Sequence, residues 1–554
     1  MKNQFSKALL WGVLLGLVIL NGIVFVPAGN SQQGTKQILR MGYKVGDIVT
    51  LDPHRSTAGQ DRIVVEAVFN GLLRYEPGNM TTEAIEPDLA KSIPKPIILQ
   101  DGRQQWTFNL RQGVMCHPYD GNPGYELTSE DVAYSLRRGA DPKYSSYSGD
   151  YNGMTFEAVD KYTVKITLEK PLSCLLFLGK FAGAGGLIVC KKPLEEKGSE
   201  WFKTHPVGTG PFMFEKYIPK NKVVLVGNKN YYRGKPHLEL FEFYLIPDLS
   251  ARELGLQTGE LDVISGLNEQ SWVEKMRKVS SVLVDLPAAN EPMVMHFNMS
   301  KPPLNLLKVR QAIAYALDRN QFIAFWGKEM ATPVYSVIPP EFCPGGLTKK
   351  EVAENGLLYD FDPAKAKKLL TEAGYPNGFT LTVNASTIAN YIEPWTLIEQ
   401  QLKKVGITIV LNPCDHATYH TLIRKDLNPL VLYNGGRENA DVFLTHYYHS
   451  DSIVATGKKP NINFSHIGAV DADGDGAIDS IDDLIMAART EVDPKKQINL
   501  WKEAQIKLLR YLAAYPINYL KCTLARKDYV DWGYKLKLVQ NFPKPNENTR
   551  ILSK

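Results

Sequence analysis

The sequence is poor in cysteine, and its cysteines lie far apart. Six are spread over 554 residues, and no two form a C-x-x-C or C-x-x-x-C pair. Zinc and iron–sulfur sites usually need such pairs, so we expect neither. Disulfides form readily in exported proteins. Cys174 and Cys190 are closest in sequence and are the best local candidates for a bridge, with free buried thiols as an equal alternative for any given pair.

Enzyme signatures and strongly charged segments are also absent. We find no HExxH, GxSxG, Walker or dinucleotide-binding motif. Residues 183–186 are rich in glycine but lack the spacing of a phosphate-binding loop, so we interpret them as a flexible turn. The formal net charge is only +5, from 64 basic and 59 acidic residues, and no basic block occurs. Nucleic acid is therefore not expected as a partner.

The first residues have the pattern of an export signal. Lys2 and Lys7 precede an apolar run from Ala8 to Leu20, which resumes from Ile23 to Val26. Val26-Pro27-Ala28 places small residues where a signal peptidase needs them, which predicts cleavage after Ala28. An uncleaved anchor is the alternative, because the apolar stretch nearly suffices to span a bilayer. No cysteine lies near this point to carry a lipid.

Composition and periodicity indicate a large globular α/β protein. Hydrophobic residues make up 44% and charged residues 22%, and the length predicts two or three lobes. Residues 61–73 have the spacing of an amphipathic helix, and Thr128 with Asp131 has the pattern of a capping box. Residues 379–383 and 407–411 alternate as strands around a helical segment at 395–405, which predicts a strand–helix–strand unit.

Several short segments follow one another in an order that is typical of one protein family. They are Leu51-Asp52-Pro53-His54, Phe69-Asn70-Gly71-Leu72-Leu73, Trp106–Arg111, Leu127–Val132, Val207–Phe212, Gly259–Asp262, and a block from Asn298 through Val309–Ile313 to Asp318-Arg319. Over about residues 38–545, the chain resembles the family 5 extracellular solute-binding proteins. These are peptide, nickel and oligosaccharide receptors of ABC importers.

The resemblance implies an α/β fold of the two-lobed periplasmic-binding-protein type with an extra inserted subdomain, a three-lobed arrangement like type II, cluster C. We expect a signal peptide at residues 1–28 and an inserted lobe II at 76–204. Lobe I is expected in three segments, at 36–75, 205–288 and 515–554, and lobe III at 289–514. The ligand is expected between lobes I and III, enclosed by hinge closure.

The resemblance also implies a function. We expect an exported, periplasmic or extracytoplasmic protein that is not an enzyme. It would bind a small organic ligand, whether peptide-like, a sugar or an acidic solute, and deliver it as a monomer to the permease subunits of an ABC transporter. The alternative is a secreted hydrolase or a periplasmic chaperone on the same scaffold. A hydrolase needs a nucleophile–base pair, and the sequence offers none that we can place.

The ligand-binding segment departs from the family pattern. Peptide-binding members carry a Trp and, three residues later, an Asp that pairs with the peptide's amine. Here Phe443-Leu444 sets the register, and these two positions hold Tyr433 and Gly436. Residues 384–387 also lack the Arg that meets a dipeptide's carboxylate. Because a buried ammonium without a counter-ion is costly, we expect a neutral or acidic solute rather than a free dipeptide.

Six residues are assigned to the ligand site from this comparison. Tyr433 offers a flat ring and Arg437 a guanidinium for an acidic group. Tyr391 and Trp395 lie at the start of a helix that follows a strand, where cleft residues often occur. The set is completed by Gly436 and His296. A structural role near the hinge is the alternative for Tyr433 and Arg437, and core packing is the alternative for Tyr391 and Trp395.

A twelve-residue segment, Asp471–Asp482, matches the calcium loop of an EF-hand. The predicted ligands are Asp471, Asp473, Asp475, the Ala477 carbonyl, Asp479 and Asp482. Gly476 occupies the sharp-turn position. Calcium takes six to eight oxygen ligands, and the carboxylates would repel one another without a cation. An Asp-rich solvated turn is the alternative. Because Asp replaces Glu at the last position and no full helix precedes the loop, we expect a structural Ca²⁺ of modest affinity.

Overall fold

The computed structural model describes residues 37–437, 439–458, 460–539 and 542–552. The predicted export signal at residues 1–28 lies outside this range. Among the helices of the described residues, none has the length and apolar character to cross a membrane. The chain folds as an α/β protein in which two large hydrophobic cores organise most of the elements.

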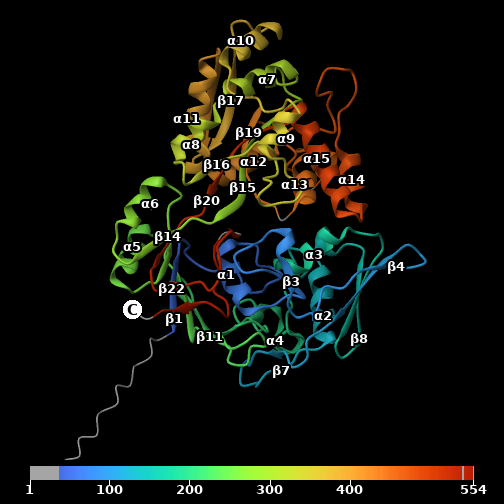
Figure 1. Ribbon diagram of the computed structural model, residues 1–554, viewed down its shortest axis with the longest axis vertical. Coiled ribbons are helices and arrows are strands. Elements are labelled where there is room, and N and C mark those ends of the chain that lie inside the picture. The colour runs from blue at the N-terminus through green and yellow to red at the C-terminus, as the bar shows by residue number, and fades with distance from the viewer. Residues whose placement is uncertain (1–36, 438, 459, 540–541, 553–554) are drawn as a thin grey trace, which may run out of the picture. The chain divides into compact units, whose positions relative to one another are not determined.

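The first core contains a seven-stranded sheet built from distant parts of the chain. Its order is β10-β11-β12-β1-β13-β21-β14, and β1 is parallel to both of its neighbours. The strands are β1 Ile38–Tyr43, β10 Phe212–Ile218, β11 Lys222–Gly227, β12 Leu240–Leu245, β13 Val263–Ser265, β14 Val282–Asp285 and β21 Leu524–Lys527. Figure 1 shows the red C-terminal segments beside the blue N-terminal ones. Helices α1 Gly59–Val68, α5 Leu249–Thr258 and α6 Gln270–Arg277 accompany the sheet.

The segment between β1 and β10 adds a smaller sheet with the order β4-β5-β9-β8. Its elements are β2 Leu73–Tyr75, β3 Ile85–Pro87, β4 Ile97–Ile98, β5 Gln104–Asn109, β6 Met115–Cys116, β7 Tyr125–Glu126, α2 Ser129–Ala140, β8 Met154–Asp160, β9 Thr163–Leu168, α3 Cys174–Ala182 and α4 Lys191–Phe202. Trp106 of β5 stacks on Phe177 of α3 at 4.0 Å between ring centroids. The capping box predicted from Thr128 and Asp131 is confirmed at the start of α2.

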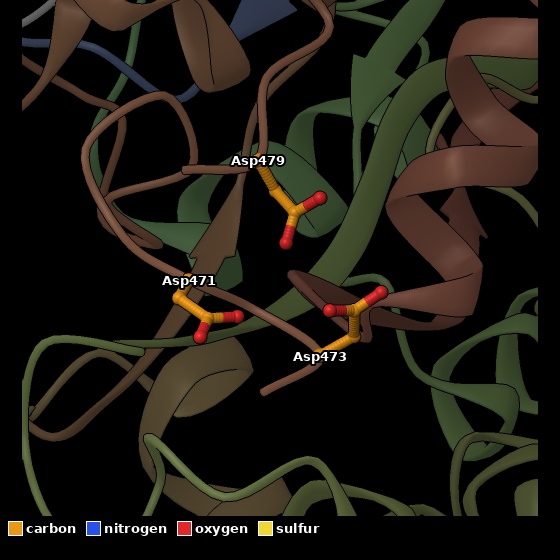
Figure 2. Close-up of side chains that lie close together, drawn as sticks. All are labelled: Asp471, Asp473 and Asp479. Atoms are coloured by element: carbon orange, nitrogen blue, oxygen red, sulfur yellow. The ribbon is translucent and has the colours of Figure 1, made fainter. Parts of the chain in front are cut away.

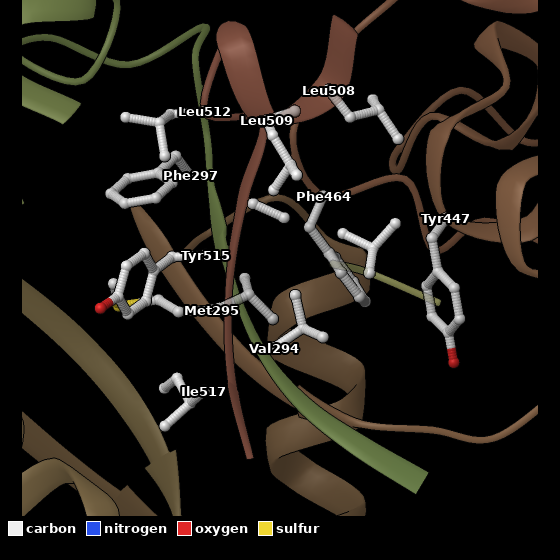
Figure 3. Packing of buried hydrophobic residues seen from close by; sticks show 14 of the residues in the cluster. Val294, Met295, Phe297, Tyr447, Phe464, Leu508, Leu509, Leu512, Tyr515 and Ile517 are labelled. Atoms are coloured by element: carbon white, nitrogen blue, oxygen red, sulfur yellow. The ribbon is translucent and has the colours of Figure 1, made fainter. Parts of the chain in front are cut away.

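The second core surrounds a sheet with the order β16-β20-β15-β19, to which β23 adds beside β15. These strands are β15 Ala288–Phe297, β16 Ala331–Pro333, β19 Leu430–Asn434, β20 Ala514–Lys521 and β23 Leu538–Val539. Figure 3 shows Met295 and Phe297 beside Tyr515, whereas Val294 turns to the side of Phe464. Side chains of β15 therefore reach two different surroundings.

Helices and one parallel strand pair complete this part of the chain. The strands are β17 Phe379–Ser386 and β18 Ile407–Cys414, which pair in parallel and confirm the predicted strand–helix–strand unit. The helices are α7 Leu307–Ala316, α8 Arg319–Trp326, α9 Lys349–Glu354, α10 Pro363–Glu372, α11 Ala389–Lys403, α12 His416–Arg424, α13 Ala440–Tyr448, α14 Asp482–Thr490 and α15 Pro494–Arg510. Strands β22 Val530–Asp531 and β24 Arg550–Ile551 pair near the C-terminus.

The disulfide prediction was wrong. Cys190 bonds to Cys116, 74 residues earlier, and Cys174 is a free thiol at the start of α3. Closeness in sequence did not decide the partner, because the fold brings the end of β6 to the residue before α4. The bond ties the β6–β7 hairpin to the start of α4.

The first predicted helix was too long. It was expected over residues 61–73, but α1 ends at Val68 and Leu73 begins β2. Asn70 lies between them and donates buried hydrogen bonds to Asp88 Oδ2 at 2.9 Å and to Tyr231 Oη at 3.1 Å. These tertiary contacts hold the segment in an extended form, although its apolar spacing is helical.

Three histidines are fully enclosed, which makes stability depend on pH. Burial lowers the pKa of His54 and of His117 from 6.5 to about 4, and that of His296 to about 3. Below pH 6.5 the unfolded chain binds protons that the folded chain does not. Folding stability must therefore fall as pH falls from about 6.5 to about 4.

We expect each such imidazole to contribute about 1.4 kcal/mol per pH unit within this window. Urea unfolding at pH 7.5, 6.5 and 5.5 should show the decline, and His117→Gln should reduce its slope. Exposed His205, changed to Gln, is the matched control and should leave the slope unchanged. Equal stability at pH 7.5 and 5.5 would contradict the prediction. Asp61, whose pKa burial raises to about 6, opposes the effect, as do other carboxyls whose pKa is raised by burial, such as that of Asp441.

Candidate functional site

The residues predicted to hold the ligand gather where β19 ends. β19 runs antiparallel to β15, with Tyr433 opposite Val294 and Asn434 opposite Met293. The chain then turns through residues 435–437. Gly435 is required here, because a Cβ at this position would lie 2.1 Å from the Tyr447 hydroxyl oxygen. This close approach of backbone and ring shapes the wall of the site.

A small pocket of about 210 Å³ opens at this wall. It is lined by Pro292, Val294, His296, Val337, Tyr433, Gly435, Phe443, Tyr447 and Tyr448. The predicted residues Tyr433 and His296 are thus brought together. Most of this volume is open to solvent, and the enclosed part is about 10 Å³, room for about one water. The pocket therefore marks a dent in an aromatic wall, not a cavity that holds a ligand.

Three buried polar atoms beside the pocket lack hydrogen-bond partners among the described residues. They are His296 Nδ1, Asn434 Oδ1 and the Tyr447 hydroxyl oxygen. Buried polar groups are ordinarily satisfied, and a bound ligand or water is a common reason for an exception. The imidazole of His296 stays neutral because burial lowers its pKa to about 3. Neutral donors and acceptors thus surround an otherwise aromatic pocket.

Arg437 lies at the rim of the pocket. Its Nε donates to His446 Nδ1 at 3.1 Å, and its Nη1 donates to the Gly436 carbonyl at 2.6 Å. Its guanidinium carbon lies 4.7 Å from the centroid of the Tyr447 ring. The cation is thus fixed in place beside the aromatic wall, where it can meet an anionic group of a ligand.

Sequence reasoning missed a carboxylate at this site. Glu291 of β15 is exposed by accessible surface, yet burial raises the pKa of its carboxyl, while Lys44 and Arg437 lower it. Glu291 belongs to no motif, and it precedes Arg437 by more than a hundred residues. No local signal marked it, because only the fold brings β1, β15 and β19 together.

The other assigned residues lie in different environments. The Tyr391 hydroxyl hydrogen-bonds to the backbone carbonyl of Asn434 at 3.4 Å, so this residue supports the end of β19. Trp395 is fully buried in the second core, which leaves it no surface for a ligand. Asp441, one of the acidic residues near Gly436, pairs with Arg489 at 2.9 Å. That carboxylate is engaged in holding α13 to α14.

A larger cavity, of about 940 Å³ including space open to solvent, lies elsewhere. It is bounded by α1, β2 and the segment around residues 542–547. Its charged side chains neutralise one another, for Glu66 pairs with both Arg62 and Lys544. The sequence instead predicts the ligand site at the end of β19, around Tyr433 and Arg437.

The predicted calcium loop brings three of its carboxylates together. One oxygen from each of Asp471, Asp473 and Asp479 lies within 4.8 Å of the others, and Figure 2 shows their carboxylates turned towards a shared space. Asp475 and Asp482 lie outside this group. Asp475 accepts from the Ala477 N–H at 2.8 Å, and Asp482 accepts from the Ser450 N–H at 3.1 Å.

The loop conformation depends on glycine and on backbone hydrogen bonds. Gly474 and Gly476 have φ values of 89° and 94°, which other residues rarely adopt. Both donate their N–H groups to Asp471, which lowers the pKa of that carboxyl. Buried Arg310 donates to the Ala472 carbonyl beneath the loop. The carboxylates of Asp471, Asp473 and Asp479 carry more negative charge than the single guanidinium of Arg310 can balance. Carboxylate oxygens are ligands that suit Ca²⁺.

Comparison with known proteins gives one consistent result. Residues 84–454 match the profile of the bacterial extracellular solute-binding proteins, family 5 Middle. The chain is 30% identical to heme-binding protein A of Haemophilus influenzae over 57% of this chain and 58% of that protein. It is 26% identical to the glutathione-binding protein GsiB of Salmonella typhi, over 83% of this chain and 84% of that one.

Among solved structures, the binding protein MoaA from A. tumefaciens R10, in complex with mannopinic acid, is 38% identical. The superposition has a TM-score of 0.74 and covers 94% of this chain and all of that one. The likeness therefore extends over both cores and the strands that connect them.

Proposed function

The chain belongs to family 5 of the bacterial extracellular solute-binding proteins. We propose that its ligand is a small organic acid that also carries a cationic nitrogen. Members of the family are binding proteins that act outside the cytoplasm. The protein captures a small organic solute there and delivers it to an ABC transporter.

One observation carries the ligand proposal. Glu291, Arg437 and Lys44 come from three distant segments, and the charges of both basic residues act on the same carboxyl. Two cations beside one anion suit a ligand with acidic groups and one amine, because each charge then meets its opposite. Tyr433 supplies an aromatic face beside the small pocket, on which an uncharged part of the solute can stack.

The similarity to MoaA supports the same class of ligand, since mannopinic acid is an organic acid by name. Peptide-binding members carry an Asp at the position that Gly436 occupies here. The carboxylate that meets the ligand's amine would therefore come from a different strand, β15, which carries Glu291. A free dipeptide therefore remains the less favoured ligand. A hydrolase is the less favoured alternative. Ser386 Oγ lies 2.9 Å from His416 Nδ1, but this hydroxyl is fully buried and also accepts a hydrogen bond from the Ile388 N–H, so it is not presented to a substrate.

The ligand prediction can be tested by thermal shift and calorimetry. We expect Tyr433→Ala to weaken binding of an organic acid by about 1–3 kcal/mol. Glu291→Gln should weaken amine-bearing acids about tenfold or more, by loss of a charge-assisted hydrogen bond, and should leave matched acids without the amine unaffected. Glu354→Gln, at an exposed site on α9, is the matched control.

Mass spectrometry of solute released from the denatured protein identifies the ligand directly. A released compound without any acidic group would contradict the proposal. So would tight binding of ordinary dipeptides that Glu291→Gln does not weaken. We also propose that residues 1–28 are removed during export, and the intact mass of the exported protein tests this.

We further propose that Asp471, Asp473 and Asp479 hold one structural Ca²⁺, with Asp475, the Ala477 carbonyl and Asp482 as remaining donors. The excess of carboxylates in the loop supports this. The bound ion would supply positive charge that holds the loop together beside α14.

Calcium should then stabilise the folded chain by about 2.7 kcal/mol at a hundredfold excess over its dissociation constant. Melting curves with calcium and with chelator measure the effect. Asp473→Asn should remove most of it, whereas Asp483→Asn, at an exposed site on α14, should not. Identical midpoints with and without calcium would refute the site.

A further inference from the structure

Two histidines of α12 face each other on the lobe that carries Tyr433. His416 is the first residue of the helix and His420 lies one turn later. Their Nε2 atoms are 3.0 Å apart, and their rings are nearly perpendicular, at 82°. Both side chains are only partly buried. Residues four apart lie on the same face of a helix, so the backbone itself holds this pair together.

A buried serine fixes the first of the two rings. Ser386 Oγ lies 2.9 Å from His416 Nδ1 and accepts a hydrogen bond from the Ile388 N–H at 3.3 Å. With Nδ1 engaged by the hydroxyl, His416 presents Nε2 to its neighbour. Such an outer hydrogen bond orients a histidine ligand at many metal sites. In His420, Nδ1 is buried without a partner, and Nε2 is the nitrogen that faces His416.

We propose that His416 and His420 bind a divalent transition-metal ion through their Nε2 atoms. Among such ions, copper(II) should bind with the highest affinity. With metal–nitrogen bonds of about 2.05 Å, the observed 3.0 Å separation corresponds to a nitrogen–metal–nitrogen angle of about 94°. A tetrahedral ion would need about 109° and a wider separation. An angle near 90° is that of tetragonal sites, which favour copper(II) and nickel(II), and copper binds the more tightly of the two.

The position of the pair agrees with a binding site. Ser386 and Cys414 are the last residues of the parallel strands β17 and β18. Ligands bind preferentially at the carboxyl ends of parallel strands. The Tyr391 ring lies 5.1 Å from that of His416, and the Tyr433 ring lies 5.6 Å from that of His420. Aromatic rings thus border the pair on both sides.

The protein supplies two nitrogen ligands at this place. Within the described residues, the only group of three or more His, Cys, Asp or Glu with metal-ligand spacing is the aspartate loop. The remaining coordination positions of the ion are therefore open to water or to the donor atoms of a small chelator. The site is distinct from the calcium loop in chemistry, because imidazole nitrogen suits copper and carboxylate oxygen suits calcium.

The test uses the full chain, saturated with calcium and titrated with copper(II) chloride alone. We expect one tight equivalent whose electron paramagnetic resonance spectrum shows coupling to two imidazole nitrogens. His416→Gln and His420→Gln should each reduce the affinity at least tenfold, and Ser386→Ala should do so to a lesser extent. His205→Gln, which changes an exposed histidine of another region, should have no effect.

Circular dichroism of each metal-free variant establishes that it folds. If a variant does not fold, the spectrum of the unaltered protein decides, and absence of coupling to two imidazole nitrogens would contradict the proposal. The proposal is overturned if the double variant His416→Gln/His420→Gln keeps the first equivalent of copper at unchanged affinity. It is equally overturned if the unaltered protein binds no copper, which would leave only a hydrogen-bonded histidine pair.

Discussion

Replacing Cys116 and Cys190 together by serine is expected to lower the free energy of unfolding by about 4 kcal/mol. The bond closes a loop of 74 residues, and the loss of chain entropy in the unfolded state grows with loop length. Both cysteine residues are buried, at 1% and 0% exposure, so the serine hydroxyls would also enter apolar surroundings. Urea unfolding of the variant and of the oxidised parent measures the difference.

Cys174→Ser is the matched control, because this thiol is unbonded and only partly buried. It should change stability by less than about 0.5 kcal/mol. Digestion without reductant should yield a peptide that links residues 116 and 190. A linkage between residues 174 and 190 would contradict the Cys116–Cys190 bond, and a variant as stable as the oxidised parent would contradict its stabilising effect.

Arg138→Met should destabilise the fold by about 3–5 kcal/mol, since it leaves a buried carboxylate without its counter-ion. Asp52 is completely buried and receives two hydrogen bonds from Arg138, at 3.0 Å and 2.5 Å. The same guanidinium contacts His54 Nδ1 at 2.8 Å. These residues join the segment after β1 to α2. Loss of the charge should therefore loosen the contact between this segment and α2.

A double-mutant cycle separates the pair from its surroundings. Adding Asp52→Asn to Arg138→Met should restore part of the lost stability, because no uncompensated charge then remains. Arg103→Met removes an exposed guanidinium that pairs with Asp101, and should leave the unfolding curve unchanged. A double variant less stable than Arg138→Met alone would show that the carboxylate is stabilised by other groups.

Features that depend on neighbouring residues were predictable. The capping box of Thr128 and Asp131 needs only residues three apart, and both hydrogen bonds form as expected. The same holds for the strand–helix–strand unit of β17, α11 and β18, whose alternation is a local pattern. The aspartate loop was recognised from spacing within twelve residues, and three of its carboxylates lie together.

Features that depend on distant segments were missed or misassigned. Trp395 was assigned to the ligand site from its position after a strand, yet the packing of the second core encloses it. Glu291 was overlooked because its partners Lys44 and Arg437 lie far away along the chain. The orientation of the facing imidazoles of His416 and His420 depends on Ser386 at the end of β17, thirty residues before His416.

By itself, the sequence determined the family, the α/β class and the local elements, because collinear motifs, capping residues and alternation act over short stretches of chain. Tertiary structure alone decided which cysteines bond, where α1 ends and that Lys44 and Arg437 act on the Glu291 carboxyl. The first sheet joins strands from residues 38–43, 212–285 and 524–527, so the chain must cross between the two cores repeatedly. Residues that meet where the chain crosses lie hundreds of positions apart in the sequence. No local sequence pattern predicts their contacts.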